Sequence, residues 1–363
     1  VTLPQHFTQY GYWSAGAGKI YHGKCPDPAS WQTYFPDQKK NKPNDPLPAK
    51  RPVNGIPKTA HFDWGPVAQP SKAMGDYQVA DWIIDQFNRK HDKPFFLACG
   101  IYRPHLPWYV PQKYFDLFSE NEIKLPSAIK DDLKDVPAAG LKMAKPQGDH
   151  TKVRKHNQWK KAVHGYLASI AFADEQVGRV LNALEKSPHA SNTIIVLWTD
   201  HGWHLGEKEH WRKFTLWERA GRTPGMFVVP KGISKVLAQG TKAGTRVDRP
   251  VGLIDIYPTL VDLCGLGENK ALEGQSLVRL LADPKSKWDR PALTTHGRKN
   301  HALRTPRWRY IRYGDGTEEL YDHKTDPNEW TNLAGQPQHA ELKKELAKWF
   351  PKKNAPGAVA KKK

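Results

Sequence analysis

Two apolar runs, each as long as a buried strand and each followed at once by polar residues, constrain this chain most. The runs are PFFLACGIY (94–102) and NTIIVLWTD (192–200), and an amphipathic helix is predicted between them over 164–186. Continuous apolar runs of this length are typical of strands that are covered on both faces. The order strand, helix, strand therefore predicts an α/β sheet with helices on its faces.

Other segments extend this prediction toward the N-terminus and the middle of the chain. A short helix that ends at Gly11 is expected within 2–13, because glycine readily takes the left-handed conformation at a helix end. Another helix is expected over 76–92, and a third strand is expected at 225–230. Two stretches, 24–72 and 119–160, are rich in polar residues and lack periodicity. They predict long surface loops, where binding specificity commonly resides.

The C-terminal third changes character. A helix is predicted over 253–266, a β-hairpin over 307–323 and a last helix over 339–350. The sequence thus predicts the following organisation: an α/β domain over 1–245, a subdomain with a small antiparallel sheet and a covering helix over 246–350, and a basic, disordered tail over 351–363.

Composition narrows the partners without choosing one. Lys and Arg exceed Asp and Glu by 56 − 37 = 19, so the surface attracts anions. A nucleic acid, an acidic membrane surface or a sulfated or phosphorylated substrate would each satisfy that charge. No apolar run approaches the ~18 residues that a membrane-spanning helix needs. The three cysteines, Cys25, Cys99 and Cys264, form neither a disulfide framework nor a zinc cluster.

Asp200 is the first residue that suggests chemistry. It is the last residue of the run 192–200 and lies in the segment TDHGWHLGE. A carboxylate at the exit of such an apolar strand is costly unless a cation or hydrogen bonds offset it. One interpretation is a metal ligand. The other is an ordinary turn aspartate, since Asp-His-Gly also favours a turn.

Five segments, in order along the chain, resemble sulfatases of the alkaline-phosphatase-like superfamily. The likeness extends over nearly the whole chain and is greatest to iduronate-2-sulfatases, because an Asp-His pair is followed by Gly-Trp-x-Leu-Gly-Glu. The segments are AGKIYHGK (17–24), YRPHLPWYVPQKYFDLF (102–118), YLASIAFADEQVGRVLNAL (166–184), TDHGWHLGEKEHWRKFTLWE (199–218) and ELYDHKTDPNEWTNLA (319–334). The resemblance implies a mixed sheet sandwiched by helices, with a small C-terminal antiparallel sheet and a helix.

The resemblance also implies the residues that hold the sulfate group. Asp200 and His201 would ligate a divalent cation, which is usually Ca²⁺ in this family. Oxygen donors suit such a hard cation, whereas histidine is a less typical ligand for it. Lys19 and Lys213 would bind sulfate oxygens as point charges. Each of these lysines, taken alone, is also compatible with an ordinary solvated surface residue.

Four further residues receive roles from the same resemblance. His22 would orient the nucleophile, and His105 would protonate the departing alcohol, a task that suits an imidazole near neutral pH. Trp203 and His204 would line the sugar subsite. In isolation each histidine could equally be a structural loop residue, so their joint occurrence carries the prediction.

Two elements of the family are missing from this chain. One is the strand end with paired aspartates that completes the metal site, and the other is the Cys-x-Pro-Ser-Arg segment whose cysteine becomes formylglycine, the nucleophile. Cys25 is followed by Pro26 and Asp27 and does not match that segment. We therefore expect a C-terminal portion of a longer sulfatase, with an incomplete Ca²⁺ site, formylglycine supplied upstream and no activity of its own.

Alternatives remain within and outside this superfamily. A phosphodiester or phosphonate hydrolase would use the same scaffold, and a non-catalytic protein that binds polyanions would exploit the net charge. A sulfated saccharide is the expected partner. A nucleic-acid partner is not expected, because the basic residues are dispersed and no nucleic-acid-binding pattern is present. The resemblance alone favours a periplasmic, extracellular or lysosome-like compartment, and the oligomeric state is left open.

Overall fold

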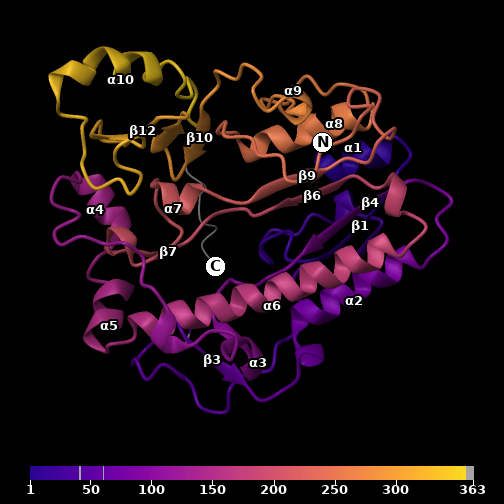
Figure 1. Cartoon of the computed structure of the whole chain (residues 1–363), viewed down its shortest axis with the longest axis horizontal. Coiled ribbons are helices and arrows are strands. Elements are labelled where there is room, and N and C mark those ends of the chain that lie inside the picture. The colour runs from indigo at the N-terminus through magenta and orange to yellow at the C-terminus, as the bar shows by residue number, and fades with distance from the viewer. Residues whose placement is uncertain (41, 60, 357–363) are drawn as a thin grey trace. The chain divides into compact units, whose positions relative to one another are not determined.

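The computed structural model describes residues 1–40, 42–59 and 61–356 and divides into two compact units (Figure 1). The first unit comprises Val1–Leu125 and Lys152–Thr193, and the second comprises Pro126–Thr151 and the chain from Ile194 onward. Neither unit ends near the expected domain boundary at 245, and that division stays a prediction. Of the tail expected to be disordered, residues 357–363 lie outside the described residues.

Helix α1 (Leu3–Gln9) begins where Thr2 forms a capping box with Gln5. The helix lies within the predicted span 2–13 and ends before Gly11, as predicted, because this glycine adopts a φ of +84° and turns the chain into strand β1 (Trp13–Gly18). The sequence analysis missed β1, whose WSAGAG sequence is poor in strand-forming residues.

The first unit holds a three-stranded parallel sheet in the order β2-β1-β4, with β2 at Thr33–Phe35 and β4 at Phe95–Gly100. The apolar run 94–102 is thus confirmed as a parallel strand, although its side chains are only partly buried. Helix α2 (Gly75–Phe87) contacts both β1 and β4.

Helix α6 (Trp159–Glu185) runs beside α2 in Figure 1 and confirms the helix predicted over 164–186. Its large apolar side chains are only partly enclosed: Leu184 is buried, whereas Ile170 and Leu181 are each 39% exposed. The buried face also carries small residues such as Gly165, where an added Cβ would lie 2.6 Å from the Cβ of Trp64. Small side chains let this helix approach its neighbours closely.

Strands β3 (Trp64–Val67) and β5 (Trp108–Pro111) form a second parallel pair against α6, followed by the short helix α3 (Gln112–Phe115). Most of 24–72 is loop, as predicted, apart from β2, β3 and 3₁₀ turns. The stretch 119–160 is not wholly loop, since it contains helices α4 (Ala138–Ala144) and α5 (Asp149–Lys155).

Strands β6 (Ile195–Trp198) and β9 (Gly225–Val228) pair antiparallel in the second unit. The prediction that the run 192–200 forms a buried strand is wrong in its burial, because Trp198 is 48% exposed. Across the ladder, Met226 and Val228 are 55% and 50% exposed. The pair of strands β6 and β9 therefore leaves large apolar side chains exposed.

The C-terminal part of the second unit agrees with its prediction. A four-stranded antiparallel sheet has the order β10-β11-β12-β13, and helix α10 packs on it through a core that includes Tyr310, Leu320 and Leu346 (Figure 1). The remaining elements of this unit are β7 (His204–Leu205), β8 (Trp211–Arg212), α7 (Glu218–Gly221), α8 (Ile256–Leu263), α9 (Val278–Ala282), β10 (Ala292–Thr295), β11 (His301–Arg304), β12 (Trp308–Arg312), β13 (Glu318–Asp322) and α10 (Ala340–Ala347).

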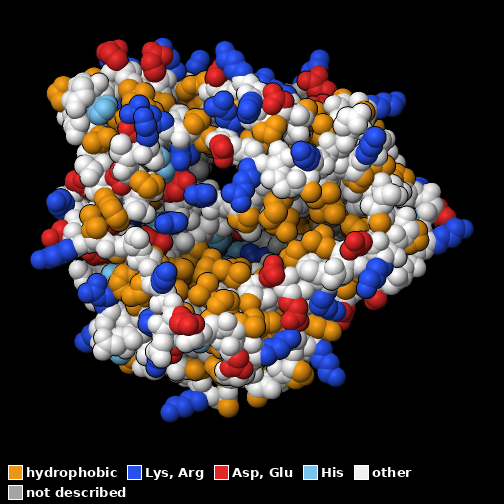
Figure 2. All heavy atoms as spheres, viewed as in Figure 1, with side chains coloured by type: hydrophobic (Ala, Val, Ile, Leu, Met, Phe, Trp, Pro, Cys, Tyr) orange, Lys and Arg blue, Asp and Glu red, His pale blue; other side chains and the backbone are white. Residues whose placement is uncertain are grey.

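Three further features complete the description. Among the described residues, no disulfide bond joins Cys25, Cys99 or Cys264. In the described part of the chain, every helix is too short or too polar to cross a bilayer. Lys and Arg side chains are scattered over the face drawn in Figure 2 and do not gather in one patch.

Two glycines with similar backbone conformations test the packing of β1. Gly11 and Gly18 have φ values of +84° and +78°, but a Cβ at Gly18 would lie 2.1 Å from the Gly100 carbonyl oxygen, whereas one at Gly11 meets nothing within 4 Å. Gly11→Ala should therefore lower the free energy of unfolding by only about 1–2 kcal/mol, the penalty for placing a side chain in the left-handed conformation. Gly18→Ala should lower the free energy of unfolding by more than about 3 kcal/mol, measured by urea denaturation. Equal losses for the two variants would contradict this packing.

Candidate active site

The carboxyl ends of β1 and β4 meet at two glycines. The Lys19 backbone N–H donates to the Gly100 carbonyl oxygen at 2.7 Å. A Cβ at Gly100 would lie 2.4 Å from the Lys19 carbonyl carbon, so only glycine permits this approach. Lys19 is thereby held at the end of the sheet where parallel α/β structures commonly bind ligands.

The ring of Tyr102 gathers four basic side chains of the first unit. The Nζ atoms of Lys19 and Lys42 lie 5.9 and 5.0 Å from the ring centroid, and the Arg103 guanidinium carbon lies 5.5 Å away. The imidazole of His105 lies 4.8 Å from the same ring. The structure thus brings the predicted residues Lys19 and His105 to one aromatic side chain.

A buried ionic network supports this ring. Asp76 is fully buried and accepts hydrogen bonds from the backbone N–H groups of Tyr102 at 2.7 Å and Arg103 at 2.9 Å. Burial raises the pKa of Asp76. Arg103 donates through Nη2 to Asp45 Oδ2 at 2.6 Å. Although burial raises the pKa of Asp45, Arg103 and Lys42 outweigh it and lower that pKa overall.

His105 is oriented by its own loop. Its backbone N–H donates to the Tyr102 carbonyl at 3.0 Å, and its Nδ1 donates to the Leu106 carbonyl at 2.9 Å. With Nδ1 protonated, Nε2 is the ring nitrogen that gains or loses a proton. The centroid of the His61 imidazole lies 5.8 Å from that of the His105 imidazole. His22, by contrast, is exposed in the turn after β1, and its carbonyl accepts from the Cys25 N–H.

Asp200 and His201 follow β6 in the second unit. The Asp200 side chain is 70% exposed, and its Oδ2 lies 3.6 Å from His201 Nε2. His201 Nδ1 donates to the Gly202 carbonyl at 2.8 Å, which directs Nε2 toward the carboxylate. The ring of Trp203 lies 6.0 Å from that of His201. One carboxylate and one imidazole therefore stand together at this strand end.

Gly202 is pressed against helix α7. Its N–H donates to the Ala220 carbonyl at 2.8 Å, and an added Cβ would lie 2.1 Å from the Arg219 carbonyl oxygen. Glu207 reinforces the loop, since its Oε2 accepts from the Leu205 N–H at 2.7 Å. The position of the Asp200–His201 turn therefore depends on α7.

His204 does not lie where the sequence analysis expects it. The side chain is fully buried, and its Nδ1 donates to the Glu207 carbonyl at 3.2 Å while Nε2 accepts from the Thr215 hydroxyl at 2.9 Å. Burial lowers the pKa of His204 well below its usual value. This enclosure argues against a contact with sugar and gives His204 a structural role. Lys213 is partly buried after β8.

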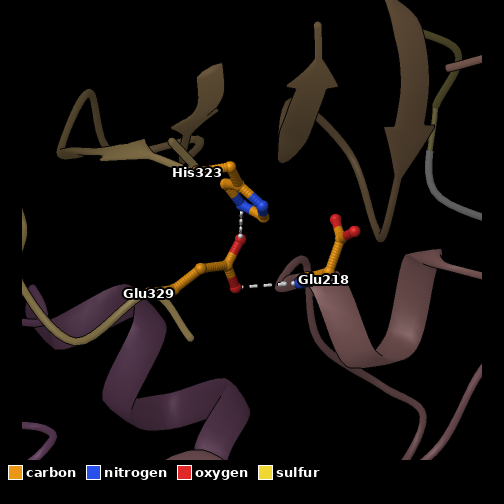
Figure 3. Close-up of side chains that lie close together, drawn as sticks. All are labelled: Glu218, His323 and Glu329. Carbon is orange, nitrogen blue, oxygen red and sulfur yellow. Dashed lines mark hydrogen bonds and ion pairs between the residues drawn. The ribbon is translucent and has the colours of Figure 1, made fainter. Parts of the chain in front are cut away.

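A cluster of Glu218, His323 and Glu329 places three ligand atoms within 4.8 Å of one another (Figure 3). His323 Nε2 donates to Glu329 Oε1 at 3.0 Å, and the other Glu329 oxygen accepts from the Glu218 N–H at 2.9 Å. Arg309 pairs with both carboxylates, and Arg304 Nε lies 3.1 Å from Glu218 Oε2. The guanidinium groups already neutralise these carboxylates, so the cluster suits a structural role better than a cation site.

A Ca²⁺ site at Asp200 and His201 would be incomplete in this chain. The pair offers one oxygen and one nitrogen, whereas Ca²⁺ takes about six to eight oxygen ligands. Within the described residues, Glu218–His323–Glu329 is the one group of three or more His, Cys, Asp or Glu side chains close enough to hold an ion. The residues present therefore fit part of a Ca²⁺ site.

Sequence reasoning missed the supporting residues of the first unit. Lys42 and Asp45 lie in a proline-rich loop without periodicity. Asp76 lies in the helix predicted over 76–92, and nothing in the sequence marks it as a supporting residue. The nearest signal was the pair Tyr102-Arg103, which precedes His105 in a recognised segment. The predicted residues fall in both units, and their convergence on one oxyanion stays a prediction.

The Glu218 ion pairs predict a stability change on acidification. Burial raises the pKa of Glu218, but Arg309 and Arg304 outweigh it and lower the pKa from 4.5 to about 2. The stabilisation is therefore complete above pH 4.5 and is lost as the pH falls toward 2, a loss of up to about 3 kcal/mol. In urea denaturation, the stability difference between the unsubstituted chain and Glu218→Gln should shrink over this range. Glu341→Gln, at an exposed position, is the control, and a constant difference for Glu218→Gln would contradict the prediction.

Comparison with known proteins agrees with the resemblance. The sulfatase family model matches residues 1–266, and the model of the N-sulphoglucosamine sulphohydrolase C-terminal region matches 206–355. A sulfatase of Formosa agariphila is 40% identical over 98% of this chain and 70% of its own length. Mouse iduronate 2-sulfatase is 28% identical over 73% of this chain, which spans 54% of that protein.

Solved structures show the same fold. The phosphonate monoester hydrolase of Silicibacter pomeroyi superposes with a TM-score of 0.76 at 19% identity, covering 96% of this chain and 78% of that one. Its likeness identifies the mixed α/β architecture with a C-terminal antiparallel sheet. The family model and the Formosa relative go further, and they show that the chain belongs to the sulfatase family.

Proposed function

We propose that this chain is part of a sulfuric ester hydrolase that acts on a sulfated carbohydrate. The proposed substrate is a glycan that contains uronate, as the likeness to iduronate-2-sulfatases suggests. The observation that carries the proposal is the placement of Lys19 and His105 at one aromatic ring, Tyr102, beyond the ends of β1 and β4. A cation and a proton donor that both lie beside one ring suit the two ends of a sulfate ester. Membership of the sulfatase family supports the reaction class.

The chemistry of sulfate ester cleavage assigns a role to each of these groups. Negative charge develops on the bridging oxygen as the alcohol departs, and His105 Nε2 would deliver the proton that neutralises it. Lys19 would hold nonbridging oxygens, and His22 would orient the nucleophile. Interactions that strengthen as this charge develops lower the barrier more than they stabilise bound substrate.

The family resemblance assigns the remaining roles to residues of the second unit. Lys213 would bind sulfate oxygens, Asp200 and His201 would ligate Ca²⁺, and Trp203 would contact the sugar. When bound, Ca²⁺ would supply positive charge to the sulfate oxygens and the nucleophile. The exposed Asp200 carboxylate and the nearby His201 Nε2 support this assignment, since both atoms lie at a strand end.

The nucleophile is the part that this chain does not contain. Its sequence has no cysteine or serine followed by x-Pro-Ser-Arg, and none of its three cysteines matches that pattern. Formylglycine in such a segment would supply the nucleophile. We therefore propose that the 363-residue chain alone hydrolyses no sulfate ester.

A phosphonate or phosphodiester hydrolase is the second candidate, because the phosphonate monoester hydrolase shares this fold at a TM-score of 0.76. These esters are all tetrahedral monoanions, but a sulfate monoester has three nonbridging oxygens, whereas a phosphonate monoester or a phosphodiester has two and carries a second organic substituent on phosphorus. Parallel assays of sulfate monoesters, phosphonate monoesters and phosphodiesters, on a protein that joins this chain to a nucleophile segment, would separate them. Preference for the phosphorus esters would reject the sulfatase proposal.

The purified chain should release no sulfate from an aryl sulfate or a sulfated disaccharide at saturating Ca²⁺. Ion chromatography of free sulfate is the measurement. Turnover that disappears in Asp200→Ala would contradict the prediction. Asp289→Ala is the matched control, because its side chain is 69% exposed in the same unit and Asp200 is 70% exposed.

His105 should matter more for poor leaving groups than for good ones. In the joined protein, His105→Ala should lower kcat on a saccharide sulfate by about 10²–10⁴-fold. An alkoxide is a poor leaving group, so the bridging oxygen must receive a proton as it departs. The loss should be much smaller for an aryl sulfate with an acidic phenol. His61→Ala, which removes the neighbouring imidazole, serves as the control. Equal losses on both substrates would show that His105 is not the acid.

A further inference from the structure

Phe214 is an exposed aromatic residue on a rigid segment. Its side chain is 51% exposed, whereas the three residues that follow it, Thr215, Leu216 and Trp217, are 3%, 2% and 1% exposed. The Thr215 hydroxyl bonds to the buried His204, so the backbone at this point is firmly held. Half of an apolar ring therefore stays in water although its chain neighbours are packed in the core.

Two side chains flank this ring. The Lys213 Nζ atom lies 5.6 Å from the Phe214 ring centroid. The centroid of the His296 imidazole lies 5.7 Å from the same ring centroid, with the ring planes inclined by 39°. The three residues, here called the Phe214 platform, come from the loop after β8 and the turn between β10 and β11. They combine an apolar face, an ammonium group and an imidazole.

The turn that carries His296 is preorganised. The His296 N–H donates to the Asn300 carbonyl at 3.1 Å, and the Asn300 side-chain amide donates to the His296 carbonyl at 3.0 Å. Asn300 Oδ1 also accepts from the Gly314 N–H at 2.8 Å. These bonds tie the turn to the neighbouring hairpin, so His296 needs little ordering to bind a ligand.

The surroundings of the platform are positively charged. Burial and the Lys145 ammonium lower the pKa of His296, which leaves a neutral ring that donates and accepts hydrogen bonds near pH 7. Arg298 and Lys299 are exposed in the same turn. In the described part of the chain, no salt bridge neutralises Lys145, Arg298 or Lys299, so this surface favours an anion over a neutral ligand.

We propose that the Phe214 platform is a sugar subsite, which binds the pyranose ring of an acidic sulfated saccharide. The C–H face of the pyranose would lie on Phe214, and His296 would hydrogen-bond a ring hydroxyl. A carboxylate of the saccharide would face Lys145 and the turn 297–299. The proposal rests on the proposed function, in which the adjacent Lys213 binds the sulfate group. It gives the sugar a specific set of contacts in the second unit.

The test measures binding by the 363-residue chain and does not need turnover. Calorimetry would use three probes: sodium sulfate, a sulfated disaccharide that contains a uronate, and the same disaccharide with its carboxylate reduced to an alcohol. Phe214→Ala should weaken disaccharide binding by about tenfold and leave sulfate binding unchanged. Phe214→Tyr should restore the affinity, and Lys213→Ala should weaken both sulfate and disaccharide. The carboxyl-reduced disaccharide should bind more weakly than the acidic one.

Trp349→Ala is the matched control, because Trp349 is another aromatic residue of this unit and is 48% exposed. It should change no affinity. Phe214→Leu, which keeps an apolar side chain, guards against misfolding and should fall between Phe214→Ala and the unsubstituted chain. Unchanged disaccharide affinity in Phe214→Ala, or equal affinity for the carboxyl-reduced disaccharide, overturns the subsite alone. Failure of the unsubstituted chain to bind sulfate at all overturns the proposed function together with it.

Discussion

The backbone contact between Lys19 and Gly100 determines what the first unit can present to a ligand. Since neither Gly18 nor Gly100 has a side chain, the ends of β1 and β4 approach more closely than any other residue pair would allow. The approach sets Lys19 beside the segment that carries Tyr102 and His105. A cation and an imidazole are thus positioned by main-chain geometry, and their side chains need little further ordering.

In the second unit, buried ion pairs position the segment that carries the proposed site residues Asp200 and His201. Lys208 and Asp132 are almost fully buried and pair at 2.7 Å, and Arg309 joins Glu218 to Glu329. Breaking such a pair leaves an unpaired buried charge, which costs about 3–5 kcal/mol. Glu218 begins α7, the helix on which the Asp200–His201 turn rests through Gly202. The C-terminal sheet therefore supports the residues proposed to bind the cation.

The parts of the fold that could be predicted were those with strong local patterns. The apolar run 94–102, the helix over 164–186 and the hairpin over 307–323 all carry periodic or turn signals, and the structure contains each of them. β1 was missed because its glycines and alanines have low strand propensity, and only pairing with two neighbouring strands makes it a strand. The buried face of α6 could be predicted only in part, because close packing also selects small residues such as Gly165, which a search for large apolar side chains overlooks.

Site residues followed a different rule. Lys19, His105 and Lys213 could be predicted only from short segments that resemble a family, since no local property distinguishes them from surface residues. Asp200 is also marked by its place at the end of an apolar run. His204 lies in one of those segments but is buried, which shows that a position within a family segment does not ensure accessibility. The net charge of +19 adds little discrimination, because dispersed charges are screened beyond about 10 Å at 0.1 M salt. Such charges speed the arrival of any polyanion. Selection among anions must come from contacts at van der Waals range, and the exposed ring of Phe214 and the partly buried ring of Trp203 lie beside the proposed ligands Lys213 and His201.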